Sequence, residues 1–143
     1  MPTYTCTSTS GRLSSSEKQK LVNRITKIHS QEGGNVPEYL VQVIFHTLPP
    51  GDHFINKSLV PKDQIWINGI IRGGRSDAQK TAMVTRMMNE CAEAIGVDRS
   101  YVWAYICDAE KTAEFGAVLP EPGKEKEWVE AIPREVRERY GMY

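Results

Sequence analysis

The feature that most constrains the fold of this chain is an internal repeat, in which the same order of residue patterns recurs at an offset of 62 positions. Pairs separated by this offset are Leu21 and Met83, Val22 and Val84, and Tyr39 and Tyr101. In each copy, a strand-like stretch is followed by an amphipathic helix and a second strand-like stretch. Because only two copies occur in 143 residues, the pattern predicts one duplicated domain and not a solenoid.

In the first copy, residues 4–7 are strand-prone, and the serines before Glu17 are typical of a helix N-cap. The predicted helix runs from about residue 15 to residue 29 and ends before the glycine pair at 33–34. The apolar residues at 39–45 then predict a strand buried on both faces.

The second copy repeats this order, with strands predicted at 64–70 and 101–106. Between them, a glycine-rich turn at 72–75 leads to Ser76, a predicted N-cap, and to a helix that ends near Gly96.

The two copies together predict an α/β fold. Each copy should form a right-handed βαβ unit with parallel strands, so two copies give a four-stranded sheet with both helices on one face. We expect a single domain over residues 1–143, with repeats at about 1–60 and 61–120 and a tail at 121–143. Since the other sheet face would be apolar and uncovered, the sequence also predicts association into an oligomer.

Two segments lie outside the repeated pattern. Residues 47–63 are rich in proline and turn residues and predict a linker between the copies. In the tail, apolar residues recur at four-residue spacing, namely Trp128, Ile132, Val136 and Tyr140. This stripe predicts a short helix, with Pro133 in its first turn, that clasps the domain or a neighbouring subunit.

Composition excludes several classes of function. The chain has 18 basic and 18 acidic residues, whereas a protein that coats nucleic acid needs a cationic surplus. No run of apolar residues reaches the roughly 20 that span a bilayer, and residues 1–10 lack the apolar stretch of a secretory signal. The three cysteines show no CxxC spacing, so we expect neither disulfides nor a zinc site, and a cytoplasmic location.

Pro2 is the first candidate for chemistry. Removal of the initiator methionine, which is common before a small residue, would leave a free prolyl amine. An α-amino group titrates near neutral pH and can act as an acid or a base. A strand that begins directly after Pro2 would hold this amine in place, although many chains begin with Met-Pro for no catalytic reason.

The turn at 72–75 is the second candidate. Arg72 and Arg75 flank two glycines at the start of the second helix, where backbone N–H groups and the helix dipole favour an anion. The arginine fork matches a carboxylate, so the turn predicts a carboxylate site, with two solvated turn arginines as the alternative.

Three more residues are candidates only in combination. His29, near the end of the first helix, could bind an anion as a charged imidazolium, or could be an ordinary surface residue. Tyr105 ends the last strand and could reach a site or pack in the core. Glu114, expected in a loop, could activate water if buried beside the arginines. The spacing of the three histidines predicts no metal site.

Together these residues resemble the tautomerase superfamily, and within it the cis-3-chloroacrylic acid dehalogenase subgroup. The resemblance runs from Pro2 to about Trp128 and includes the motifs at 68–76, 102–105, 113–116 and 119–123. It implies the duplicated β-α-β tautomerase fold with a mixed four-stranded sheet, assembled as a homotrimer. It also implies a small carboxylate substrate and no cofactor. One departure is Ala117, where the dehalogenase pattern tends to carry an arginine.

The same resemblance implies a division of roles. Glu114, with Tyr105, would activate water to attack C3 of an unsaturated acid such as cis-3-chloroacrylate. Arg72, Arg75 and His29 would hold the substrate carboxylate, and protonated Pro2 would deliver a proton to C2. Two alternatives stay open. One is a keto–enol tautomerase of the phenylpyruvate type with Pro2 as its base, and the other is a non-enzymatic trimeric binding or signalling module.

Overall fold

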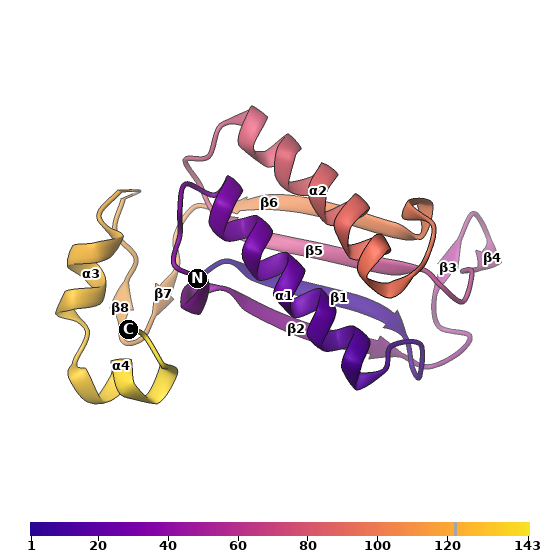
Figure 1. The fold of residues 1–143 in the computed structure, drawn as a ribbon, viewed down its shortest axis with the longest axis horizontal. Helices are drawn as coiled ribbons and strands as arrows, with labels where there is room; N and C mark the ends of the chain where they lie inside the picture. Colours follow the sequence, from indigo (N-terminus) through magenta and orange to yellow (C-terminus); the bar gives the residue numbers. More distant parts are fainter. Residues whose placement is uncertain (122) are drawn as a thin grey trace.

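A single mixed sheet forms the centre of the computed structural model, which describes residues 1–121 and 123–143. Its strands lie in the order β2-β1-β5-β6 and comprise β1 (Thr3–Thr9), β2 (Gln42–Leu48), β5 (Ile65–Arg72) and β6 (Val102–Ala109). β1 is parallel to β2 and β5 is parallel to β6, whereas the central pair β1 and β5 is antiparallel. Each sequence copy therefore contributes one parallel pair, and the copies meet at the centre (Figure 1).

Two long helices, α1 (Ser15–Glu32) and α2 (Asp77–Ile95), lie side by side on one face of this sheet, as predicted (Figure 1). Both begin with a capping box, in which Ser14 pairs with Glu17 and Ser76 pairs with Gln79. The main core lies between the helices and the sheet, where side chains such as Leu21, Ile67 and Met83 are buried.

The second strand of each copy begins later than the sequence predicts. A 3₁₀ helix, η1 (Glu38–Leu40), precedes β2, and η2 (Arg99–Tyr101) precedes β6. The prediction that the strand at 39–45 is buried on both faces is wrong for the single chain, because β2 is an edge strand with one open face. Val43 and Phe45 pack against the core, but Ile44 is 43% exposed.

The sheet face opposite the helices is open and apolar. Its exposed side chains include Ile44, Ile70, Trp103 and Tyr105, which come from three of the four strands. Such a surface favours contact with another protein surface. Within the described part of the chain, no helix is long and apolar enough to cross a membrane.

Two small hairpins extend from opposite ends of the sheet (Figure 1). The predicted linker at 47–63 contains the hairpin of β3 (Phe54–Ile55) and β4 (Ser58–Leu59). At the other end, β7 (Ala113–Glu114) pairs with β8 (Ala117–Val118), so Glu114 lies in a hairpin and not in an irregular loop.

The tail forms two helices, α3 (Glu125–Ala131) and α4 (Arg134–Tyr140), and not the single helix that the apolar stripe predicts. Proline has no N–H and disfavours the helical conformation in the preceding residue, so the helix is interrupted at Ile132 and Pro133. The tail packs on its own chain in a second apolar cluster, around Val36, Leu40, Ile132 and Met142. Figure 1 shows α3 and α4 beside the N-terminus.

Candidate active site

The start of β1 fixes the N-terminus at the end of the sheet that the tail covers. Pro2 is buried, and its carbonyl oxygen accepts a hydrogen bond from the Gln42 backbone N–H at 2.9 Å. The Met1 ammonium group forms an ion pair with Oε2 of Glu114. The chain terminus and the Glu114 carboxylate are therefore brought together across 113 positions of sequence.

A strained turn presents Glu114 to this terminus. The residue after it, Phe115, has a φ of +54°, a left-handed conformation that is unfavourable for an aromatic residue. The Phe115 ring packs against Trp128 of α3 and Tyr140 of α4, with ring centroids 5.7 and 4.9 Å apart. Packing against the tail thus holds the turn, and with it the carboxylate, in place.

Arg72 lies at the end of β5, where it contacts the tail. Its Nη1 donates to the carbonyl oxygen of Pro120 at 2.9 Å, and its Nη2 is ion-paired with Glu125 at the start of α3. The guanidinium group of Arg72 is thus occupied by a carboxylate of the same chain.

Arg75 follows in the turn before α2. Its Nη1 donates to the Arg72 carbonyl oxygen at 2.8 Å, and no carboxylate of the described residues lies within ion-pair distance of it. The backbone at the helix start is less available than expected, because the N–H groups of Ser76 and Gln79 bond within the capping box. The arginine side chains are therefore the main anion-binding groups of this turn.

His29 is fully buried and reaches the same site from α1. Burial, followed by the charges of Arg75 and the chain terminus, lowers the pKa of His29 to about 4. The expectation of a charged imidazolium is therefore wrong, because the ring is neutral at neutral pH. Its position near the helix end does not compensate for the loss of solvent.

Tyr4, which no sequence pattern indicates as a site residue, orients this histidine. Its hydroxyl lies 2.6 Å from Nδ1 of His29, and burial raises the pKa of Tyr4, so the phenol stays protonated. With the Tyr4 hydroxyl donating to Nδ1, the N–H of the neutral ring lies on Nε2. Nε2 is buried and has no partner among the described residues, so it is free to donate to a ligand.

The absence of a side chain at Gly69 leaves space for the Tyr4 ring. Gly69 lies opposite Tyr4 in the pairing of β1 with β5. A Cβ atom at Gly69 would lie 2.4 Å from the Tyr4 ring, a separation that real Cβ atoms do not show. Glycine at this position is thus required for the Tyr4–His29 contact.

Tyr105 is the one predicted site residue that does not join the others within the chain. It is 47% exposed on the open sheet face, where its ring packs edge-on against Trp66 with centroids 5.5 Å apart. Its register partner, Asn68, lies four residues before Arg72 along β5. Within a single chain, Tyr105 therefore does not contribute to the site around Pro2.

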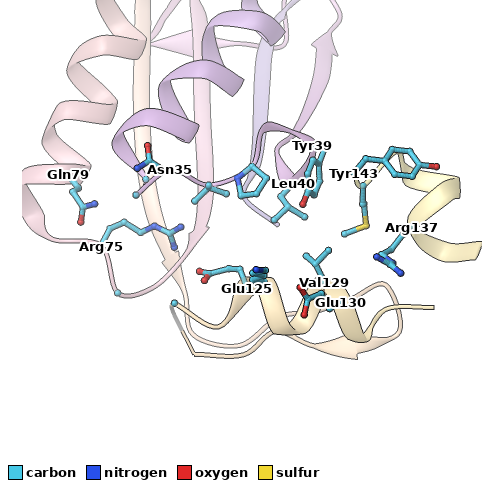
Figure 2. A pocket seen from close by; sticks show the side chains of 18 residues that line it. Asn35, Tyr39, Leu40, Arg75, Gln79, Glu125, Val129, Glu130, Arg137 and Tyr143 are labelled. Atoms are coloured by element: carbon cyan, nitrogen blue, oxygen red, sulfur yellow. The ribbon is translucent and has the colours of Figure 1, made fainter. Parts of the chain in front are cut away.

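Two adjoining cavities at this end of the molecule have Arg75 in their walls. We call the smaller one, about 30 Å³, the inner cavity; it is lined by Met1, Pro2, His29, Arg72, Arg75 and Trp128 among others. The larger one, about 670 Å³, is the outer cavity, and both share Val36, Leu40, Arg75 and Glu125. Figure 2 shows the outer cavity between Arg75, Tyr39 and Leu40 on one side and Glu125 and Val129 of the tail on the other.

The charges around the inner cavity act on the terminal amine in opposite directions. Burial has the largest effect and lowers the pKa of the Met1 ammonium group, while Glu114 raises it and Arg72 and Arg75 lower it. The net effect is a lowered pKa. The lowered pKa increases the fraction of this amine that is neutral at a given pH, and the neutral form is the one that accepts a proton. Among the residues that the structure describes, no cluster of side chains is arranged to hold a metal ion.

Comparisons with known proteins agree with this architecture. The family model that matches is described as "Putative oxalocrotonate tautomerase enzyme" and covers residues 1–132. No curated protein matches the chain. The solved structure of N1, a member of the cis-3-chloroacrylic acid dehalogenase (cis-CaaD) family, is 30% identical, with a TM-score of 0.90 and 99% of each chain covered.

More distant structures share the fold. A fused 4-OT solved as an asymmetric trimer is 21% identical, with a TM-score of 0.68, covering 75% of this chain and 85% of that one. Leishmania major MIF2 is 16% identical, with a TM-score of 0.66, covering 83% of this chain and 97% of that one. From the family match and the similarity to N1, the chain is an enzyme of the tautomerase superfamily and belongs to its cis-3-chloroacrylic acid dehalogenase-like subgroup.

Proposed function

We propose that this protein is a cofactor-independent hydratase that adds water to a 3-substituted unsaturated carboxylic acid such as cis-3-chloroacrylate. The observation that carries the proposal is that the Glu114 carboxylate reaches the N-terminus of the chain, where it pairs with the Met1 ammonium group next to Pro2 and beside Arg72 and Arg75. Addition of water to a conjugated acid needs a base for the water, an acid for C2 and cations for the developing enolate charge. Glu114, the terminal amine and the two arginines are groups of these three kinds.

In this proposal, removal of Met1 exposes the Pro2 amine as the catalytic terminus. Glu114 takes a proton from water, whose oxygen bonds to C3 of the substrate. The electron pair of the multiple bond moves toward the carboxylate, and protonated Pro2 then delivers a proton to C2. With a 3-haloacrylate, the adduct loses halide and a proton to give malonate semialdehyde.

The substrate carboxylate binds between the arginines and His29 in this scheme. Within residues 1–121 and 123–143, no carboxylate is ion-paired with Arg75, whereas Glu125 must release Arg72 before that guanidinium group can bind substrate. Neutral His29 contributes as a hydrogen-bond donor through Nε2 and not as a cation. Tyr4 is a positioning residue that fixes this orientation.

We further propose that the working form is a homotrimer. The open sheet face carries exposed apolar side chains from three strands, and a solved relative of the same fold is a trimer. Tyr105 lies on this face and away from its own inner cavity. It would therefore assist Glu114 only at the site of a neighbouring subunit.

The proposed location of the protein in the cell is the cytoplasm.

A keto–enol tautomerase of the phenylpyruvate type is the second candidate, with Pro2 as its base. Burial lowers the pKa of the Met1 ammonium group. A Pro2 amine exposed by removal of Met1 would lie in the same surroundings, which favour the neutral form that accepts protons. This reaction uses the amine and the arginines but does not need the Glu114 carboxylate.

Kinetics and nitrogen NMR of the Met1-free protein test both candidates. We expect hydration of propiolate and 3-haloacrylate, lost in Pro2→Ala and in Glu114→Gln. A Glu114→Gln variant that loses hydration but keeps phenylpyruvate tautomerisation would assign the carboxylate to water activation. A Pro2 pKa above neutral supports the acid role, and one below it supports the base role. No turnover of either acid above buffer would refute the hydratase proposal.

A further inference from the structure

Met1 fills a definite space beside the candidate site. Its ammonium group is held by Glu114, and only 18% of its side chain is exposed. The side chain packs into the second apolar cluster, around Val36, Leu40, Ile132 and Met142. The Met1 ammonium group thus contacts Glu114, the proposed base, while the Met1 side chain lies in an apolar pocket.

The residues that line the inner cavity around Met1 are of two chemical kinds, charged and apolar. The charged groups Arg72 and Arg75 line the inner cavity together with Met1. Val36, Leu40 and Trp128 also line it, and these three belong to or pack against the apolar cluster into which the Met1 side chain packs. A ligand that replaced Met1 would thus meet both cations and apolar side chains.

We propose that the space vacated by Met1 is an apolar subsite that binds the C3 substituent of the substrate, and that the preferred substrates carry an unbranched alkyl chain there. This inference rests on the proposed hydration and names its substrate class. It assigns 2-alkynoic or 2-alkenoic acids as substrates in place of three-carbon acids. The alkyl group on C3 of these acids would be about as long as a methionine side chain.

The relative positions of the groups support this orientation. A carboxylate bound at Arg75 and Arg72 directs the multiple bond toward Glu114, which must lie close to C3 to deliver water there. The Met1 ammonium group occupies this place next to Glu114, and the Met1 side chain continues from it into the apolar cluster. A substituent on C3 would follow the same path. The shared walls at Val36 and Leu40 then lead toward the outer cavity.

The corresponding reaction balances without another reactant. For 2-hexynoate, the water oxygen bonds to C3, one water proton goes to Glu114, and a proton from Pro2 adds to C2. The resulting enol rearranges to 3-oxohexanoate, so the net change is the addition of one water molecule. The propyl group takes no part in the chemistry and contributes only binding.

Binding of saturated acids tests the subsite separately from catalysis. Isothermal titration of the Met1-free protein with propionate and hexanoate compares ligands that differ by a propyl chain. Since each buried methylene strengthens binding by up to about fourfold, we expect hexanoate to bind about 10- to 50-fold more tightly. Equal affinities would overturn the proposal. If hexanoate binds tightly but neither propiolate nor 2-hexynoate is hydrated, the proposed function fails while the subsite stands.

Two substitutions at position 2 test whether the Met1 side chain and the alkyl chain of the ligand occupy the same space. Pro2→Ala and Pro2→Leu both lack the prolyl amine, but only leucine is large enough to prevent methionine removal, which intact mass verifies. We expect Pro2→Ala to keep the preference for hexanoate and Pro2→Leu to lose it. The same preference in both variants would overturn the proposal.

Two variants that each fill part of a cavity test where the alkyl chain of the ligand binds. Leu40 borders both cavities, whereas Glu130 is exposed, borders only the outer one and is not part of the apolar cluster. Leu40→Trp should remove the preference for hexanoate with little change for propionate, and Glu130→Trp should keep it. If Glu130→Trp removes the preference while Pro2→Leu keeps it, the alkyl chain lies in the outer cavity and the proposal is wrong.

Discussion

The hydroxyl of Tyr4 lies 2.6 Å from Nδ1 of His29, so a buried tyrosine of β1 fixes the orientation of the histidine at the end of α1. This contact explains why the histidine can serve as a directed donor although it carries no charge. It also links the candidate site to the central strand pair, because Tyr4 lies opposite Gly69.

His29 makes stability depend on pH. Its pKa falls from the usual 6.5 to about 4 in the folded protein, so between these values the unfolded chain binds more protons. The free energy of unfolding should therefore rise as pH increases from 4 to 6.5, by on the order of 3 kcal/mol, and level off above. Urea unfolding of the wild type and His29→Gln across this range measures it. An unchanged slope in the variant would contradict the assignment to His29.

Gly69→Ala should disturb both stability and the site. The added Cβ would lie 2.4 Å from the Tyr4 ring and 2.9 Å from Cδ1 of Ile106, so one of these side chains must move. We expect a loss of about 1–3 kcal/mol in unfolding free energy and weaker carboxylate binding. Gly73→Ala is the control, because its Cβ would meet only the Ala109 carbonyl oxygen at 3.9 Å. Equal effects of the two substitutions would argue against the close approach at Gly69.

Glu125→Gln should strengthen substrate binding. Glu125 occupies the Arg72 fork, so a substrate carboxylate must compete with it. We expect the variant to lower KM by about 3- to 10-fold, with kcat little changed, because an ionic partner becomes a weaker neutral one. Steady-state kinetics with propiolate measures this, and Glu127→Gln, an exposed position of α3, is the matched control. A higher KM in Glu125→Gln would mean that Glu125 assists binding.

Charge on the open sheet face should break the proposed trimer. Trp103 is 40% exposed on β6 beside the other apolar side chains of that face. Burying a lysine there without a partner is unfavourable, so Trp103→Lys should shift the protein to smaller species in light scattering. Thr85→Lys on the exposed side of α2 should have no effect. If the Trp103→Lys variant has the same oligomer mass in solution as the wild type, the subunit contact lies elsewhere.

Local sequence patterns predicted the fold well where the interactions that form it are local. Ser14 with Glu17 and Ser76 with Gln79 act within one helical turn, so the helix starts could be read directly. The interruption at Ile132 shows the limit, because the apolar spacing continues through it while Pro133 divides the helix. The apolar stripe alone was not sufficient evidence for one helix.

The candidate site was predicted only in part, because its contacts join distant segments. Pro2, His29, Arg72, Arg75 and Glu114 do meet at one end of the sheet. Tyr4 appeared only as part of a strand-prone stretch, and nothing local indicates that its hydroxyl reaches His29. Glu125 was one acid in a charged tail, and its pairing with Arg72 depends on how the tail folds back. The neutrality of His29 likewise depends on burial, which the sequence does not specify.

The tail that covers the N-terminus has a consequence for the order of events during biosynthesis. Once Glu114 and α3 have folded over it, Met1 is held by an ion pair and by apolar packing, and its peptide bond is poorly accessible to an aminopeptidase. In the proposed removal of Met1, an aminopeptidase would therefore reach this residue most easily on the emerging chain, before Glu114 and α3 have folded over it. Chains that escape this step would fold with the site filled by their own first residue.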